Sequence, residues 1–163
     1  MSQDQKEQFL ELCRKFDNAM LVTRAEDGTI QARPMVVAKF ESDGDLWFAT
    51  DLDSGKVDEI LNSSQVCVTL SGSGNYASIS GVAEVVRDEA MVQQLWSEPW
   101  RVWFPDGPTD PRIALIKVHS KEGEYWSNSG TNGLKYLFQA AKAYATGQRP
   151  TDSSSSQHGR VKL

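Results

Sequence analysis

Four side chains that can bind an anion lie at or beside the ends of two neighbouring apolar runs of the sequence. Thr50 ends the run at residues 46–50, Ser54 and Lys56 follow it, and Arg33 lies in the run before it. An arginine offers a planar pair of donors, a lysine a mobile point charge, and the hydroxyls further donors. Charge-assisted hydrogen bonds of this kind hold a terminal phosphate dianion. The residue types therefore indicate a phosphate site.

The segment that contains Ser54 and Lys56 is itself predicted to be a short helix. It puts Val57, Ile60 and Leu61 on one face behind a serine N-cap. The free N–H groups at such a helix start favour an anion. A lysine in the first turn is unfavourable for the helix dipole by itself, so the position of Lys56 suggests a bound anion as its partner.

A predicted hairpin brings Arg33 towards this helix. If Asp43 and Gly44 form a two-residue turn, Ser42 opposes Asp45, and the same register sets Arg33 opposite Ser54. The alternative is that Arg33 is an ordinary strand arginine paired with a nearby aspartate, Asp51 or Asp53, and that Ser54 is only a helix cap. The residues alone leave both interpretations open.

The rest of the chain reads as short β-runs joined by tight turns, with helices at the two ends and between strands. Consecutive strands without crossover helices predict an antiparallel sheet, and closure into a six- to seven-stranded barrel flanked by short helices removes its edges. An open α+β sheet is the alternative. Strands are predicted at 19–24, 30–40, 46–50, 65–70, 76–87 and 112–120 with a hairpin partner at 123–128, and helices at 3–16, 54–62, 88–96 and 134–145.

Length and composition predict a single domain. A chain of 163 residues with 39% hydrophobic residues can build one full core. We assign residues 1–146 to the barrel domain. Residues 147–163 contain almost no apolar side chains, and we expect them to be a disordered polar tail.

The net charge and the cysteine content indicate which binding partners and which cellular location to expect. The net charge of −5 argues against binding to nucleic acid or to an anionic membrane, so a small partner is expected. Two separated cysteines, Cys13 and Cys67, form neither a disulfide framework nor a zinc site, which favours a reducing cytoplasm. No apolar stretch approaches the length of a membrane span, and the N-terminus lacks the features of a secretory signal.

At the residues discussed above, the sequence resembles the pyridoxamine 5'-phosphate oxidase-like, FMN-binding split-barrel family, and within it the general stress protein branch. The resemblance runs over most of residues 5–145. The matching segments follow one another in the order and spacing of that family: Ala32-Arg33-Pro34-Met35, Leu46-Trp47-Phe48-Ala49-Thr50, Ser54-Gly55-Lys56-Val57, Ser80-Gly81-Val82-Ala83 and Glu124-Tyr125-Trp126.

The resemblance implies a mainly β split barrel that binds FMN, with FAD as an alternative, and that forms a homodimer. It implies that Arg33, Ser54 and Lys56 hold the flavin phosphate and that Thr50 contacts the ribityl phosphate side. Met35 and Val36 would line the flavin through backbone contacts. Ala49 and Gly55 lie inside the matching segments and belong to the same implied cofactor-binding set. Trp126 would approach the flavin across the dimer interface.

Two departures from the family pattern bear on activity. The position five residues beyond Arg33, where the oxidase has a lysine for the substrate phosphate, is Ala38, and Lys39 points to the other face. Residues 127–132 also lack the Arg-x-His motif that follows the tryptophan in the oxidase. Oxidation of pyridoxamine phosphate is therefore not expected. The sequence leaves open an FMN-dependent oxidoreductase with an unidentified substrate and a non-enzymatic protein that stores or senses flavin.

Other side chains capable of chemistry receive no catalytic or metal-binding role. His119 and His158 have no neighbours in the sequence that suggest a triad or a metal site. Trp100, Trp103 and Phe104 lie in a proline-rich loop at 97–111, and Trp96 directly precedes it, so that the four form an aromatic cluster in the sequence. Their default interpretation is anchoring of that loop to the core, and a wall over the flavin or a dimer contact is the alternative.

Overall fold

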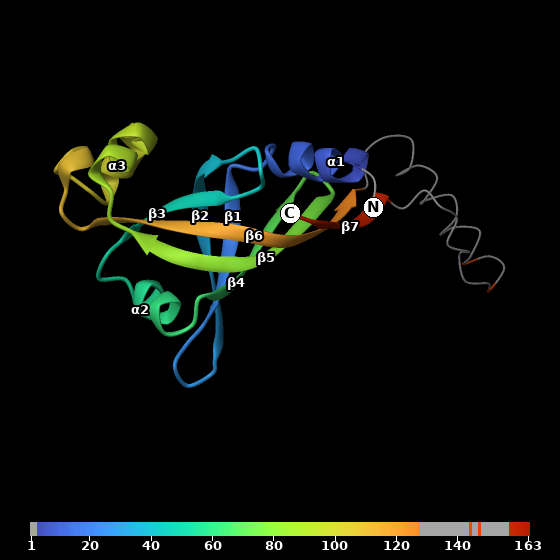
Figure 1. The fold of residues 1–163 in the computed structure, drawn as a ribbon, viewed down its shortest axis with the longest axis horizontal. Helices are drawn as coiled ribbons and strands as arrows, with labels where there is room; N and C mark the ends of the chain where they lie inside the picture. Colours follow the sequence, from blue (N-terminus) through green and yellow to red (C-terminus); the bar gives the residue numbers. More distant parts are fainter. Residues whose placement is uncertain (1–2, 128–143, 145–146, 148–156) are drawn as a thin grey trace.

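The computed structural model describes residues 3–127, 144, 147 and 157–163. It contains seven antiparallel strands, three short helices and two 3-10 turns (Figure 1). In chain order they are α1 (Gln3–Cys13), β1 (Asn18–Arg24), β2 (Ile30–Phe40), β3 (Leu46–Asp51), α2 (Gly55–Asn62), β4 (Gln65–Gly72), β5 (Asn75–Val86), α3 (Glu89–Leu95), η1 (Glu98–Val102), η2 (Gly107–Thr109), β6 (Ile113–Ser127) and β7 (Gln157–Lys162).

Six strands close into a barrel. Their order is β3-β2-β1-β4-β5-β6, and β6 pairs back onto β3. All of these pairings are antiparallel. The closed barrel therefore confirms the predicted fold class and excludes the open sheet, and the seventh strand, β7, extends the sheet beyond the barrel by pairing with the second half of β6.

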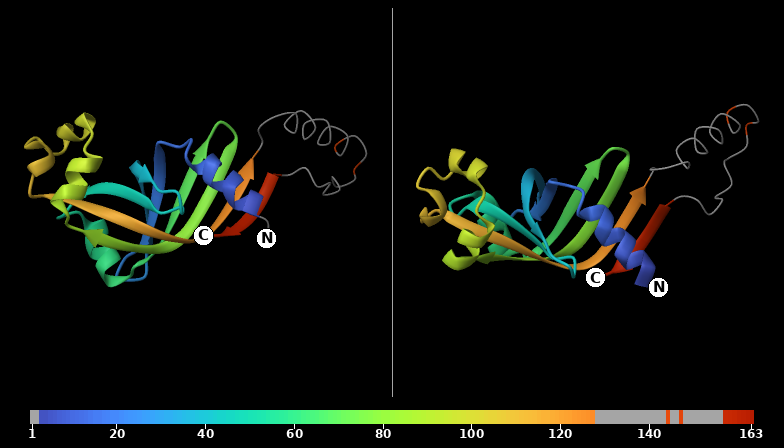
Figure 2. Two further views of the ribbon diagram at one scale, coloured as in Figure 1. Left: turned by 45° about the horizontal axis from the view of Figure 1, so that its top comes forward. Right: turned by 90° about the horizontal axis from the view of Figure 1, so that it is seen from above.

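The barrel interior is filled by alternate residues of its strands. On β1 the inward positions are Ala19, Leu21 and Thr23, all buried. The helix α1 lies across the barrel end near β7 (Figure 2) and adds Phe9 to the same core. Phe9 packs directly on Gly123 of β6, where an added Cβ would lie 2.3 Å from the phenyl ring.

The prediction of a hairpin between residues 112–120 and 123–128 is wrong. This stretch forms one continuous strand of fifteen residues, β6, with a register shift near Lys121 opposite the Ser80–Gly81 step of β5. Gly123 has no side chain at a point of β6 where Phe9 occupies the space above the strand.

The prediction of a disordered tail at 147–163 is wrong for residues 157–162, which form β7. Most of the strand's contacts are backbone pairs with β6 over Glu122 to Ser127, so few apolar side chains are needed. Val161 is fully buried in the main core, which shows how one apolar residue in a polar segment can anchor a strand. The predicted helix at 134–145 falls almost entirely outside the described residues.

Among the described residues, no helix has both the length and the apolar character needed to cross a membrane.

Candidate anion-binding pocket

Three of the four predicted anion-binding residues, Thr50, Ser54 and Lys56, line a pocket of about 340 Å3 at the end of the barrel away from α1 and β7. Figure 1 places α2 and the η1–η2 segment at this end. Three pieces of chain supply polar or apolar walls: β2, the end of β3 with the start of α2, and the segment at η1. The lining residues are Pro34, Met35, Val36, Ala49, Thr50, Asp51, Ser54, Lys56, Trp100, Trp103 and Phe104.

The turn between β3 and α2 positions the polar wall. The Asp51 carboxylate accepts a hydrogen bond from the Asp53 amide at 2.9 Å, and the Asp51 carbonyl accepts one from the Ser54 amide at 3.1 Å. This local structure ends the strand and starts the helix within three residues. Thr50 and Lys56 are thereby brought to the same place although six residues separate them.

Lys56 is held by hydroxyl groups. Its Nζ donates to Ser54 Oγ at 2.6 Å and to Thr50 Oγ1 at 3.1 Å. Ser54 occupies the predicted N-cap position, but its side chain makes no capping hydrogen bond to the helix. Lys56, Ser54 and Thr50 therefore converge as the sequence predicts.

The electrostatic environment of Lys56 is unfavourable for a cation. Desolvation by burial lowers the pKa of Lys56 from 10.5, and the nearby Arg33 guanidinium lowers it further. Asp51 and Glu59 act in the opposite direction but do not overcome these effects. An anion entering the pocket would relieve this penalty, because it would supply the opposite charge next to the lysine ammonium.

Arg33 lies beside the pocket and is paired with a glutamate. Its Nη2 donates to Glu59 Oε2 at 2.7 Å, and its Nη1 donates to the Thr23 hydroxyl, which donates to the same carboxylate. The alternative of an ion-paired strand arginine is thus partly right, with Glu59 in place of the two aspartates. Arg33 is still within Coulombic range of Lys56, whose pKa it lowers.

The predicted register between Arg33 and Ser54 is wrong. The turn contains three residues, because the Glu41 amide bonds to the Asp45 carbonyl at 2.8 Å, and Gly44 adopts a positive φ of 107°. A bulge between Val37 and Lys39 shifts the register again. The pairing of β2 with β3 ends at Val37, and Arg33 lies opposite Leu21 on β1.

Sequence reasoning missed Glu59 and Thr23, which orient Arg33. Glu59 lies three residues after Lys56, so both side chains share one face of α2. Thr23 continues the inward alternation of Ala19 and Leu21 on β1, and a polar residue at such a position needs a partner. Helical spacing and strand alternation were therefore the signals available in the sequence.

The proline-rich loop at 97–111 contributes apolar side chains to the pocket: Trp100, Trp103 and Phe104. Trp100 and Phe104 are buried in a second core cluster with Trp47, Val92, Ile113 and Leu115, which confirms their anchoring role. Trp103 is 65% exposed and also lines the pocket.

Three predicted residues do not line this pocket. Arg33 stands behind it, and Gly55 forms the first residue of α2 between two lining residues. Trp126 lies on β6, thirteen residues beyond Ile113, which pairs with Asp51 at the pocket. At roughly 3.3 Å per strand residue, that is about 40 Å along the strand. Trp126 is therefore remote from the pocket of its own chain.

Both histidines have carboxylate partners that their sequence neighbours do not reveal. His119 lies between Asp45 at 3.0 Å and Glu84 at 2.9 Å, and His158 contacts Glu124 at 2.8 Å. The His158 ring also stacks on Trp126 with ring centres 5.1 Å apart. Neither histidine lines the pocket.

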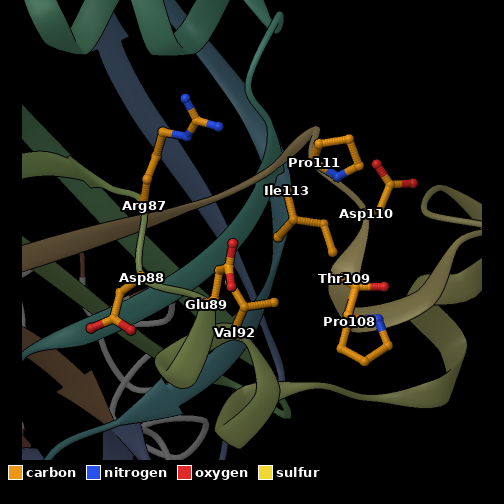
Figure 3. A pocket seen from close by; sticks show the side chains of 9 residues that line it. All are labelled: Arg87, Asp88, Glu89, Val92, Pro108, Thr109, Asp110, Pro111 and Ile113. Carbon is orange, nitrogen blue, oxygen red and sulfur yellow. The ribbon is translucent and has the colours of Figure 1, made fainter.

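A second hollow, of about 350 Å3, lies between α3 and the η2 segment (Figure 3). Its acidic groups have structural roles: the Asp88 side chain caps α3 at the Met91 amide, and Asp110 is paired with Arg112 at 2.7 Å. In Figure 3 the carboxyl groups of Asp88 and Asp110 point to opposite sides. These two carboxyl groups therefore do not converge on one point of the hollow (Figure 3).

Comparison with known proteins gives consistent matches. A family model described as pyridoxamine 5'-phosphate oxidase-like matches residues 4–151. Protein bli-3 of Neurospora crassa is 31% identical over 145 residues, which cover 82% of this chain and 69% of that protein. The structure of the general stress FMN/FAD binding protein of Xanthomonas citri is 30% identical, with a TM-score of 0.67 over 79% of this chain and 92% of that one. A candidate general stress protein 26 of Jannaschia sp. shares the fold at 22% identity, with a TM-score of 0.71 over 99% and 100% of the two chains.

The proximity of Arg33 and Lys56 can be tested through the pKa of the lysine. NMR titration of 13C-methylated lysines, with the Lys56 signal assigned by its loss in Lys56→Arg, should give a pKa below 10.5. Arg33→Met should raise this pKa, because it removes a neighbouring cation. Asp51→Asn should lower it, because it removes a neighbouring carboxylate. An unchanged pKa in Arg33→Met would contradict the described geometry.

Proposed function

From the membership of this chain in the pyridoxamine 5'-phosphate oxidase-like family, we propose that its pocket binds a flavin mononucleotide by the terminal phosphate. The observation that carries this proposal is the convergence of Lys56 with two hydroxyls at the start of α2, in an environment that lowers the pKa of the lysine. The Xanthomonas citri relative, described as an FMN/FAD binding protein, supports the same ligand class.

The polar wall of the pocket would hold the phosphate. Lys56 would exchange its bonds to Ser54 and Thr50 for bonds to phosphate oxygens, and those hydroxyls would then be free to donate as well. The Gly55 amide at the helix start adds a backbone donor. Arg33 is held by Glu59 and Thr23 outside the pocket lining, and its positive charge would attract the phosphate from there.

The apolar wall would hold the flavin ring. Met35, Val36 and Ala49 line this part of the pocket from β2 and β3. The pocket volume lies at the lower end of the range for small-molecule sites, so a flavin would fill it rather than lie loosely within it. FAD shares the ring and the proximal phosphate and is the alternative cofactor.

A flavin bound in this pocket is compatible with two classes of function. When bound, the flavin would supply hydride and electron transfer by its ring. The first class is an FMN-dependent oxidoreductase with an unidentified small substrate, and the second is storage or sensing of flavin in a general stress protein. Ala38, at the position of the oxidase's substrate lysine, packs against the second core cluster, which argues against pyridoxamine phosphate as the substrate.

A homodimer is part of the proposal. Met20, Val36, Tyr76 and Trp126 are all large, exposed apolar residues, and the strand register places them on the outer face of the sheet. Val36 also lines the pocket, so this apolar face is continuous with the site. Because Trp126 is about 40 Å along β6 from the pocket of its own chain, only a second subunit could bring it to a flavin.

We propose a cytoplasmic location, because two well-separated cysteines do not form the disulfide framework of a small secreted protein. Cys13 and Cys67 are free, and burial raises the pKa of the Cys13 thiol to about 12.

The phosphate site predicts that FMN binds much more tightly than riboflavin. Lys56→Gln and Arg33→Ala should each weaken FMN by roughly tenfold or more, since a charge-assisted bond contributes about 1.5–3 kcal/mol. Riboflavin affinity should change little in both variants. Arg24→Ala, one strand away from Arg33 on β1 and outside the pocket, is the matched control. Equal affinities of the wild type for FMN and riboflavin in fluorescence titration would refute the phosphate site.

The dimer predicts twice the chain mass for the flavin-loaded protein in light scattering at micromolar concentration. Trp126→Asp should shift the mass towards that of a single chain, because it places a charge in the buried apolar surface. Glu122→Asp, four residues earlier on β6, is a matched surface change that should leave the mass unaltered. A monomer with flavin bound would exclude the dimer.

The two functional classes differ in how the bound flavin responds to a reductant. In anaerobic solution, rapid bleaching of the flavin absorbance by NADH or NADPH at near-millimolar concentration, followed by recovery in air, is expected of an oxidoreductase. A bound flavin that neither nucleotide bleaches is expected of storage or sensing. Formation of pyridoxal phosphate from pyridoxamine phosphate would overturn the exclusion of vitamin B6 chemistry.

A further inference from the structure

Trp103 lines the anion-binding pocket and its large side chain is 65% exposed. The neighbouring Val102 is 79% exposed but does not line the pocket. A large indole left open to water at a pocket rim forgoes much of the burial that stabilises other tryptophans. The packing of the barrel core therefore does not explain its presence.

The segment that carries Trp103 is rigid. On either side of Trp103, the side chains of Trp100 and Phe104 are buried against β3 and β6. The amides of Trp103 and Phe104 both donate to the Trp100 carbonyl, at 2.9 and 3.0 Å. The backbone around Trp103 is thus fixed by anchors on both sides.

A second set of contacts supports the same turn from its outer side. Arg101 forms two hydrogen bonds with Glu98, at 3.0 and 3.2 Å, and lies over the Trp96 ring. Trp96 in turn meets Trp100 edge to face, with ring centres 5.9 Å apart. The contacts within the loop therefore hold the backbone at Trp103 beside the pocket without a ligand.

The pocket is divided between a polar end and two apolar walls. Lys56, Ser54 and Thr50 form the polar end, while β2 and the η1 segment supply apolar surface from distant parts of the chain. A molecule whose phosphate lies on Lys56 must place the rest of its structure along these apolar walls. A planar aromatic ring fits that demand, because it can pack against β2 with one face and an indole with the other.

We propose that Trp103 is a ring-stacking residue of the pocket, which covers one face of the bound flavin ring. This inference rests on the proposed flavin function. Stacking acts on the ring, which FMN and riboflavin share, whereas Lys56 acts on the phosphate, which only FMN carries. The two contributions can therefore be separated by comparing the two ligands.

The test uses three variants of the full chain: Trp103→Ala, Trp103→Phe and, as the matched control, Val102→Ala. Trp103→Ala should weaken FMN and riboflavin by the same factor, about tenfold, and leave the ratio of their affinities unchanged. Trp103→Phe, which keeps an aromatic ring, should remain within about threefold of the wild type. Val102→Ala should bind both ligands as the wild type does. Bound-flavin fluorescence should rise in Trp103→Ala, because an indole in contact with a flavin quenches its emission.

The outcomes separate this inference from the proposed function. If the wild type prefers FMN over riboflavin but Trp103→Ala binds both like the wild type, stacking is refuted and the phosphate site stands. If Trp103→Ala is monomeric where the wild type is dimeric, Trp103 is a subunit contact and the stacking role is also refuted. If the wild type binds no flavin, the proposed function itself fails. Unchanged thermal unfolding of ligand-free Trp103→Ala shows that any loss of binding is not a loss of folding.

Discussion

The pocket depends on one electrostatic constraint: two cations, Arg33 and Lys56, lie near each other at the end of the barrel away from α1 (Figure 1). Arg33 is compensated by Glu59, which accepts its hydrogen bond at 2.7 Å. Lys56 instead donates to the hydroxyls of Thr50 and Ser54, and burial and Arg33 both lower its pKa. A hydroxyl can accept a hydrogen bond from an ammonium but does not neutralise its charge. The polar part of the pocket therefore favours an anionic group. The apolar side chains that line the rest of the pocket would select the molecule to which that group belongs.

The fold supplies this arrangement by bringing three distant parts of the chain to one end of the barrel. Closure of β6 onto β3 fixes the end of β3, and the short turn after Asp51 fixes the start of α2 relative to it. The η1 segment is anchored against the same two strands by Trp100 and Phe104. The strand β6 is fifteen residues long, so Trp126 near its end lies far from the pocket of its own chain. In the dimer that we propose, a second copy of the chain would bring its Trp126 to this pocket.

Much of the barrel could be predicted from the sequence because its signals are local. Alternating apolar residues on β1 and β4, and turn residues such as Gly28 with a positive φ of 87°, mark strands and turns within a few positions. Lys56, Ser54 and Thr50 were found because their positions relative to a strand end and a helix start are also local. The failures have local and distant causes. The three-residue turn and the bulge after Val37 moved Arg33 out of its expected register. The sequence predicted a hairpin where β6 is continuous and Phe9, far earlier in the chain, packs on Gly123. Val161 reaches a core built by residues far earlier in the chain, which a polar local sequence does not reveal.

We propose that the phosphate of FMN binds beside Lys56, Ser54 and Thr50, and 31P NMR of the bound ligand can detect this contact. The dianion of a free phosphate monoester takes up a proton near pH 6 and becomes a monoanion. Next to the charges of Lys56 and Arg33, the bound phosphate should remain a dianion well below pH 6, since nearby cations favour the charged form. Lys56→Gln should move its titration back towards that of free FMN. A bound phosphate that titrates like free FMN in the wild-type protein would contradict the account.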